Sequence, residues 1–158
     1  MKFLPIFPDE ANNNYRGLVL ALWFFYLYLA LIAFRSFTHM FAQDAGLNSI
    51  ASIIIFPVIN NLDPNSVIYA MGSLWGGSQI VVFIFLVIIL LKYKSLLSIA
   101  WLILVSENML RIITMMIHNL EPEYFTSTAP GGFVGTSIML FVTPVSYTHL
   151  TLPTKVYV

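Results

Sequence analysis

One short stretch of the chain places strong charges inside an otherwise apolar segment. Glu107 and Arg111 stand four residues apart, a spacing that puts both side chains on one face of a helix. Thr114 and His118 continue that face. A charge at mid-membrane costs at least about 2.5–3.5 kcal/mol on insertion scales, so such residues face a bundle interior and pair with one another. The stretch therefore predicts an inward-facing charge pair.

Other polar residues lie where neighbouring apolar segments could bring them to the same depth. Arg35 and His39 close the first apolar run, again at four-residue spacing, while Tyr69 and Gln79 occupy the first half of the second run. Because guanidinium groups bind carboxylates and similar anions bidentately, two arginines suit an anionic ligand. We expect a binding pocket in the outer half of the bundle formed by Glu107, Arg111, His118, Arg35, His39, Gln79 and Tyr69.

A structural role is the alternative for the charge pair, because Glu107 and Arg111 could neutralise each other and lock helix packing. The histidines His39 and His118 fit interfacial positions better than a metal site, since two histidines on separate helices with one glutamate make a weak metal signal. The sequence shows neither a nucleophile–base pairing nor a cofactor motif, so we expect no metal, no cofactor and no catalytic residues.

Composition places these residues in a membrane protein. Hydrophobic residues make up 59% of the chain and charged residues only 9%, against about 25% charged in ordinary soluble domains. The net charge is zero, so nothing indicates a nucleic-acid partner, which would require a clustered basic face. Cysteine is absent, which excludes disulfides and thiolate metal ligands. Lipid is the solvent that fits this composition.

Apolar runs of about 20 residues, the length that crosses a bilayer, define the expected spans. Residues 17–34, 66–91 and 95–118 meet this length, and a fourth run over residues 131–143 begins but stops short. Lipid offers no partner to unpaired backbone groups, so each span is expected to be helical. We predict an all-α transmembrane bundle in one integral membrane domain over residues 1–143, with a truncated fourth span.

Between spans one and two, the apolar run is too short to cross a bilayer and is broken by Pro57. Such runs suit a surface or re-entrant segment. We predict a short interfacial helix over residues 46–56, and an undersized additional span is the alternative.

Basic residues predict the orientation, because cytoplasmic loops collect Lys and Arg. Lys92 and Lys94 lie in the tight loop between spans two and three, and Lys2 and Arg16 precede span one. Arg35, at the far end of span one, disagrees. We predict a plasma (inner) membrane protein with a cytoplasmic N-terminus, and outside loops carrying Asp44, Asp63, Glu121 and Glu123.

Gly72 and Gly76 have the G-x-x-x-G spacing that lets helix backbones approach closely. The contact could lie within the chain. It could also join a second copy or another membrane protein through the Gly72/Gly76 face.

Residues 145–154 read Val-Ser-Tyr-Thr-His-Leu-Thr-Leu-Pro-Thr. They resemble a translated transposase sequencing adapter, whose bases GTC TCT TAT ACA CAT CTG ACG CTG CCG ACG encode these residues in order. The polar residues Ser146 to His149 also fall where the fourth span should continue. We interpret residues 144–158 as a non-native tail, with the gene cut at about Thr143.

The segment Gly72-Ser73-Leu74-Trp75-Gly76-Gly77 in span two, together with Arg111 late in span three, resembles the small four-helix membrane proteins of the DoxX-like type. The resemblance covers residues 17–143 and implies a four-helix membrane fold, with little about function. The loop over residues 44–65 is longer than that pattern.

Three functions remain open. The first is a non-enzymatic multi-pass membrane protein that packs alone or with a partner. The second is a binding or transport unit for a small anionic or amphiphilic molecule. The third is a membrane enzyme or redox accessory in which Glu107 or His118 moves protons, and it has the least support.

Overall fold

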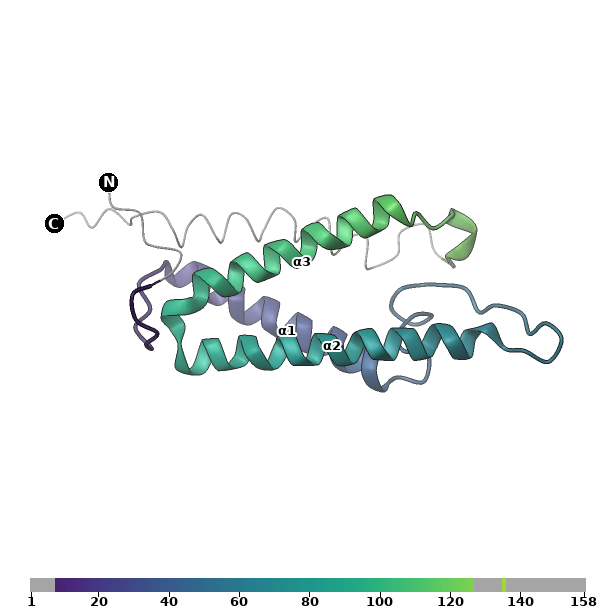
Figure 1. The fold of residues 1–158 in the computed structure, drawn as a ribbon, viewed down its shortest axis with the longest axis horizontal. Helices are drawn as coiled ribbons and strands as arrows, with labels where there is room; N and C mark the ends of the chain where they lie inside the picture. Colours follow the sequence, from purple (N-terminus) through teal and green to yellow (C-terminus); the bar gives the residue numbers. More distant parts are fainter. Residues whose placement is uncertain (1–7, 127–134, 136–158) are drawn as a thin grey trace.

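The computed structural model describes residues 8–126 and 135 of the 158-residue chain. Within them the elements run α1 (Val19–Phe41), α2 (Pro64–Lys92), η1 (Lys94–Leu96), α3 (Leu97–Ile117) and η2 (Pro122–Tyr124) (Figure 1). No strand occurs in these residues, only two isolated bridges. The predicted fourth span and the tail over 144–158 lie outside the described residues, apart from Gly135.

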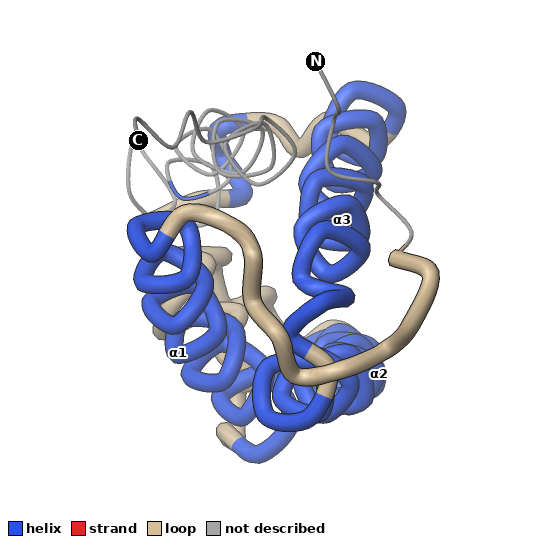
Figure 2. Tube along the Cα trace, turned by 90° about the vertical axis from the view of Figure 1, so that its left-hand side faces the viewer, coloured by secondary structure: helices blue, strands red, loops and turns tan. Residues whose placement is uncertain are grey.

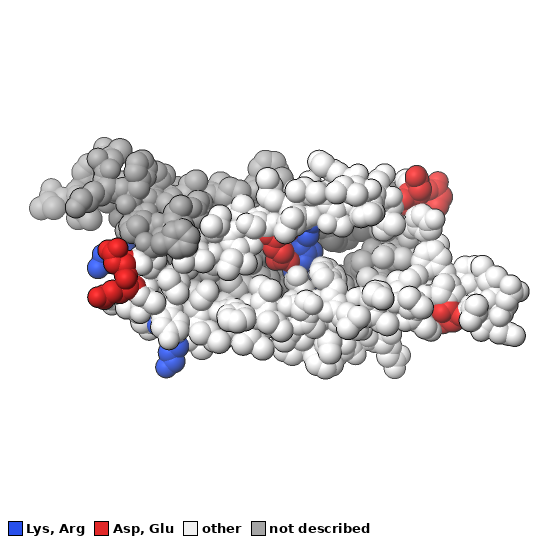
Figure 3. Space-filling view, in the orientation of Figure 1, with Lys and Arg blue, Asp and Glu red and all other residues white. Residues whose placement is uncertain are grey.

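Three helical segments are long and apolar enough to cross a membrane: Val19–Phe41, Pro64–Lys92 and Lys94–Ile117. They confirm the three complete spans predicted from the sequence. Large apolar side chains on all three helices are exposed, among them Trp23, Phe85 and Met116. Figure 3 shows that charged residues gather at the two ends of the molecule and at one place midway along it. An apolar girdle between two charged ends is the surface of an integral membrane protein.

The start of α2 follows from its first residues. Asp63 is the N-cap, and its carboxylate accepts a hydrogen bond from the backbone N–H of Asn65 at 2.9 Å. Pro64 occupies the first helical position, where its missing N–H leaves no hydrogen bond unmade.

Helices α1 and α2 approach each other most closely at Gly76. Figure 2 shows the three helices at the corners of a triangle, with α1 beside α2. A Cβ added at Gly76 would lie 2.5 Å from the backbone nitrogen of Met40 and 2.6 Å from the carbonyl carbon of His39. At Gly72 an added Cβ would lie 3.0 Å from side-chain atoms of Ala45 and Leu47. Both glycines are buried within the chain, so the face considered for a partner packs against the protein itself.

Helix α3 meets α1 through large side chains. Trp101 is 1% exposed and packs edge-on against Phe25, with ring centroids 5.5 Å apart. It also stacks on Tyr28 at 6.1 Å, with the two ring planes 1° apart. These aromatic contacts are the centre of the apolar core, which also contains Ala21, Leu29, Ile32, Leu86, Leu90, Leu97, Ala100 and Leu104.

The helix predicted over residues 46–56 is not present, because this segment forms a series of turns. Ala45 and Gly46 have positive φ angles of 50° and 69°, which a right-handed helix excludes. The carboxylate of Asp44 accepts hydrogen bonds from the backbone N–H groups of Gly46 at 2.9 Å and Ser49 at 2.7 Å. Local side-chain hydrogen bonds of this kind compete with helix formation and stabilise turns.

The two loops at this end of the bundle are joined to each other. The backbone N–H of Ile54 donates to the carbonyl of Tyr124 at 3.0 Å, and that of Thr126 donates to the carbonyl of Ser52 at 2.8 Å. The α1–α2 loop is therefore fixed to the segment that follows α3.

Candidate polar site inside the bundle

Glu107 is the centre of a polar cluster to which all three helices contribute. Its Oε1 accepts hydrogen bonds from Nη2 of Arg35 in α1 at 3.1 Å and from Nε2 of Gln79 in α2 at 3.0 Å. The same oxygen accepts from Nε and Nη2 of Arg111 at 3.1 and 2.7 Å. Arg35 also donates to Oε1 of Gln79. The predicted contact between Glu107 and Arg111 is thus present, and Arg35 forms a second ion pair with the same carboxylate.

The charges of this cluster do not balance. Two guanidinium groups face one carboxylate, which leaves a formal charge of one positive unit in the middle of the bundle. The side chains are shielded but reachable, at 18% exposure for Arg35, 19% for Arg111 and 20% for Glu107. Figure 3 shows this charged group midway along the molecule, with the surface hollowed beside it. An uncompensated positive charge in a low-dielectric setting attracts an anion more strongly than it would in water.

Trp75 of α2 forms an aromatic wall beside both arginines. The guanidinium carbon of Arg111 lies 5.0 Å from the centroid of its ring, and that of Arg35 lies 5.8 Å away. Both distances are within cation–π range. Trp75 was not among the site residues predicted from the sequence, although its position four residues before Gln79 puts both side chains on one helix face.

Three of the predicted pocket residues form no hydrogen bond to the Glu107 cluster, although the ring of His39 packs against that of Trp75, with centroids 4.5 Å apart. His39 is buried, and its Nδ1 donates to the backbone carbonyl of Ala45 at 2.6 Å, since a carbonyl only accepts. Tyr69 donates its hydroxyl to Oδ1 of Asn48 in the α1–α2 loop at 2.5 Å. His118 is the exposed C-cap of α3. His39 and Tyr69 thus bind the α1–α2 loop, and His118 ends α3. Of the predicted residues, the four that meet in one cluster are Arg35, Gln79, Glu107 and Arg111.

A second polar contact inside the bundle was also not predicted. Asn108 is 2% exposed, and its Nδ2 donates to the hydroxyl oxygen of Tyr28 at 2.8 Å and to the carbonyl of Leu104 at 2.9 Å. Asn108 directly follows Glu107, so the polar stripe on α3 is wider than the four-residue spacing alone indicated.

The site keeps spare hydrogen-bonding capacity. Nε of Arg35 is buried and has no hydrogen-bond partner within residues 8–126. Oε2 of Glu107 likewise accepts no hydrogen bond from the described side chains, because all four donors converge on Oε1. Buried donors without partners cost free energy, which a bound acceptor would recover.

Among the described residues, no three His, Asp or Glu side chains lie together in a way that could hold a metal ion. Comparisons with protein-family models, with curated proteins and with solved structures return no match to this chain.

Proposed function

We propose that this chain is an integral membrane protein that binds a small anion, such as a halide or a carboxylate, at the Arg35–Glu107–Arg111 cluster. The observation that carries the proposal is the convergence of two guanidinium groups on one carboxylate oxygen, with one positive charge left over. Trp75 provides an apolar wall, which suits an anion with a hydrophobic part.

In this proposal the carboxylate of Glu107 lies between Arg35 and Arg111, where the external anion would bind. An external anion gains both arginines when Glu107 is protonated, so the anion and one proton bind together. The other titratable side chains near the cluster are Tyr28 and His39, both on α1. Arginine stays protonated at all accessible pH values. Anion binding should therefore strengthen as the pH falls.

Thermal unfolding of the purified protein tests the proposal with chloride and acetate as probes at constant ionic strength. We expect stabilisation by at least one of them, increasing at lower pH. Arg35→Gln and Arg111→Gln should weaken the apparent affinity by at least about tenfold, since each removes hydrogen bonds to a charge. Lys92→Gln, at the end of α2, is the matched control and should bind normally. Equal responses of all four proteins would overturn the proposal.

A structural lock is the second candidate, favoured by the bonds that tie α1, α2 and α3 to one oxygen. The triple variant Arg35→Met, Glu107→Met, Arg111→Met separates the two functions. Replacing a complete buried ionic cluster by apolar side chains is often neutral for stability. If the cluster is only a structural lock, the triple variant should fold like the wild type, and neither protein should bind the anion. If the cluster is a binding site, the triple variant should fold but lose the anion binding that the wild type shows.

We also propose the finer topology: a plasma (inner) membrane location, a cytoplasmic N-terminus and a fourth span after residue 131. The four-helix DoxX-like fold implied by the resemblance agrees with this arrangement. A homo-oligomer or a protein partner would need another surface than Gly72 and Gly76, which pack within the chain.

A further inference from the structure

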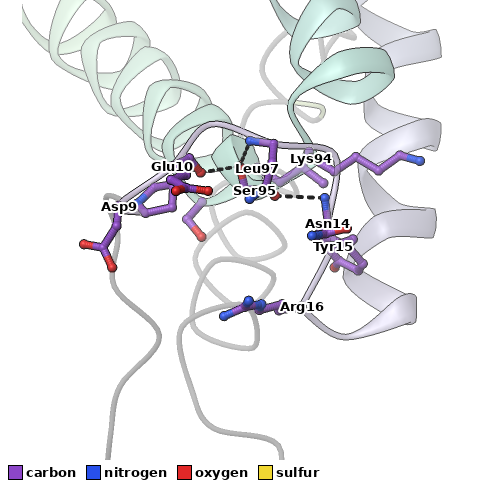
Figure 4. Close-up of a pocket in the computed structure, with 12 residues that line it drawn as sticks. Asp9, Glu10, Asn14, Tyr15, Arg16, Lys94, Ser95 and Leu97 are labelled. Carbon is purple, nitrogen blue, oxygen red and sulfur yellow. Dashed lines mark hydrogen bonds between the residues drawn. The ribbon is translucent and has the colours of Figure 1, made fainter.

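A cavity of about 310 Å³ lies at the end of the bundle that carries Lys94, away from the Glu107 cluster. The arm that precedes α1 forms one side and the start of α3 the other (Figure 4). The polar residues that line it include Asp9, Glu10, Asn14, Arg16, Ser95 and Ser98. This volume is at the lower end of the range that small-molecule sites occupy.

The shape of the cavity is fixed by hydrogen bonds that hold the arm before α1 against Ser95. The backbone N–H of Asn12 donates to Oγ of Ser95 at 2.9 Å, and the N–H of Ser95 returns a bond to the carbonyl of Asn12 at 3.1 Å. Oγ of Ser95 also donates to the carbonyl of Glu10 at 3.3 Å. Two segments that lie 83 positions apart are thus joined at one residue.

Tyr15 fixes the junction between the arm and α1. Its hydroxyl donates to the carbonyl of Leu18 at 2.6 Å, and its ring packs against the apolar core. Burial raises the pKa of Tyr15 to about 12, so the phenol stays neutral and repels no anion.

Three charged groups that line the cavity form no ion pair with any residue that the structure describes. They are the guanidinium group of Arg16 and the carboxylates of Asp9 and Glu10. In Figure 4 the side chain of Arg16 extends beneath the arm toward the side on which Asp9 and Glu10 lie, while the ammonium group of Lys94 points the other way. Among the described lining residues, Arg16 therefore offers a guanidinium group, and Asp9 and Glu10 offer two carboxylates, to a ligand.

The cavity lies beside the ends of two apolar helices, which in a bilayer would bring it to the level of the lipid headgroups. Its lining includes Gly17, two residues before α1 begins, and Leu97, the first residue of α3. Both helices belong to segments that are long and apolar enough to cross a membrane. A ligand in this position is within reach of the bilayer surface.

We propose that this cavity binds an amine-bearing phosphodiester, the chemistry of the ethanolamine headgroup of a phospholipid. The phosphodiester pairs with Arg16, and the primary ammonium group donates to Asp9 and Glu10. A purely anionic headgroup would face two carboxylates, which repel it. A choline headgroup has no N–H to donate, and quaternary ammonium groups are held by aromatic cages, whereas Tyr15 is the only aromatic side chain among the described lining residues.

Native mass spectrometry and thermal unfolding of the full chain in detergent test this site. The probes are phosphatidylethanolamine, phosphatidylcholine, phosphatidylglycerol and soluble glycerophosphoethanolamine. We expect selective retention of phosphatidylethanolamine and stabilisation by it. Arg16→Gln, and separately the double change Asp9→Asn with Glu10→Gln, should weaken retention by about tenfold, as expected for lost hydrogen bonds to charged groups. Lys92→Gln removes a charge from the same end of the bundle outside the cavity and should retain the lipid.

Thermal unfolding without added lipid shows whether each variant is folded. Arg16 makes no hydrogen bond within the described residues, so Arg16→Gln should unfold at the same temperature as the wild type. Preference for phosphatidylglycerol, or equal retention of the choline and ethanolamine lipids, would overturn the proposal. Glycerophosphoethanolamine binding as tightly as the lipid would show a soluble ligand and exclude the bilayer as its source. None of these results depends on anion binding at Glu107.

Discussion

Arg35 and Glu107, which lie 72 positions apart in the chain, form an ion pair of 3.1 Å across the centre of the bundle. This contact joins α1 to α3 directly. Arg111 pairs with the same carboxylate from within α3. The cluster is therefore a triad of two cations and one anion, and its members are not equivalent.

Removing the anion should harm the protein more than removing either cation. Glu107→Gln leaves two arginines facing each other in a shielded site, and stranded buried charges cost about 3–5 kcal/mol. Arg111→Met leaves a neutral pair between Arg35 and Glu107 and should cost less. Urea unfolding in a mild detergent measures the free energy of unfolding of each variant. If the site binds anions, added acetate should restore Glu107→Gln toward the wild-type value and leave Arg111→Met nearly unchanged.

An inverted order, with Arg111→Met the more destabilising change, would show that Arg111 acts through packing on Trp75 rather than through charge. The variant Trp75→Phe would then test this packing, since it keeps a smaller aromatic ring beside both guanidinium groups.

Gly76→Ala should disrupt the contact between α1 and α2. The new Cβ would lie 2.5 Å from a backbone nitrogen of α1, which cannot move aside like a side chain. Overpacking of this kind typically costs about 1–3 kcal/mol. Gly77→Ala is the matched control, because its Cβ would meet only the sulfur of Met40 at 3.3 Å. Alanine is the better helix former by about 1 kcal/mol, so Gly77→Ala should be neutral or stabilising. Thermal unfolding compares the two, and equal melting temperatures would contradict the close approach at Gly76.

The predicted orientation can be tested without background, because the chain contains no cysteine. Lys94→Cys and Glu121→Cys place single thiols at opposite ends of the spanning helices. In intact cells a membrane-impermeant maleimide should label position 121 and not position 94, and lysis should expose both. Labelling of position 94 in intact cells would reverse the topology.

The turn after α1 should loosen in acid. Partial burial acts to raise the pKa of Asp44, but the hydrogen bonds from Ser49 and Gly46 outweigh it and lower the pKa below its ordinary value. A lowered pKa in the folded state means that the stabilisation is complete above the ordinary aspartate pKa of about 4 and is lost as the pH falls through the lower folded value. Limited proteolysis of the α1–α2 loop should therefore accelerate in that acidic range. Asp44→Ala should make cleavage fast at neutral pH and nearly independent of pH.

The adapter resemblance of residues 145–154 predicts that the native gene departs from this sequence after about Thr143 and continues the fourth span with apolar residues. Resequencing the locus with a library chemistry that uses no transposase measures this directly. Genomic DNA that encodes Val145 to Thr154 would show that the tail is native.

Local patterns in the sequence determined the membrane class, the three complete spans and the contact between Glu107 and Arg111. Each depends on residues close together in the chain: an apolar run long enough to cross lipid, or a four-residue spacing on one helix face. The Gly72–Gly76 spacing likewise predicted a close helix approach, without showing which helix would fill it. The fourth span and the DoxX-like resemblance stay predictions.

The tertiary structure alone decided which distant side chains meet. Arg35 and Gln79 reach Glu107, whereas His39, Tyr69 and His118, which have equally suitable types and spacing, are used by loops and a helix end. Spacing along one helix fixes a face but not the rotation of that helix against its neighbours. In this bundle the rotation follows from the Gly76 contact and the stacking of Trp101 on Tyr28. The apolar pattern could not predict the turn over residues 42–51 either. That turn depends on hydrogen bonds from backbone N–H groups to the Asp44 carboxylate, which hydropathy does not describe.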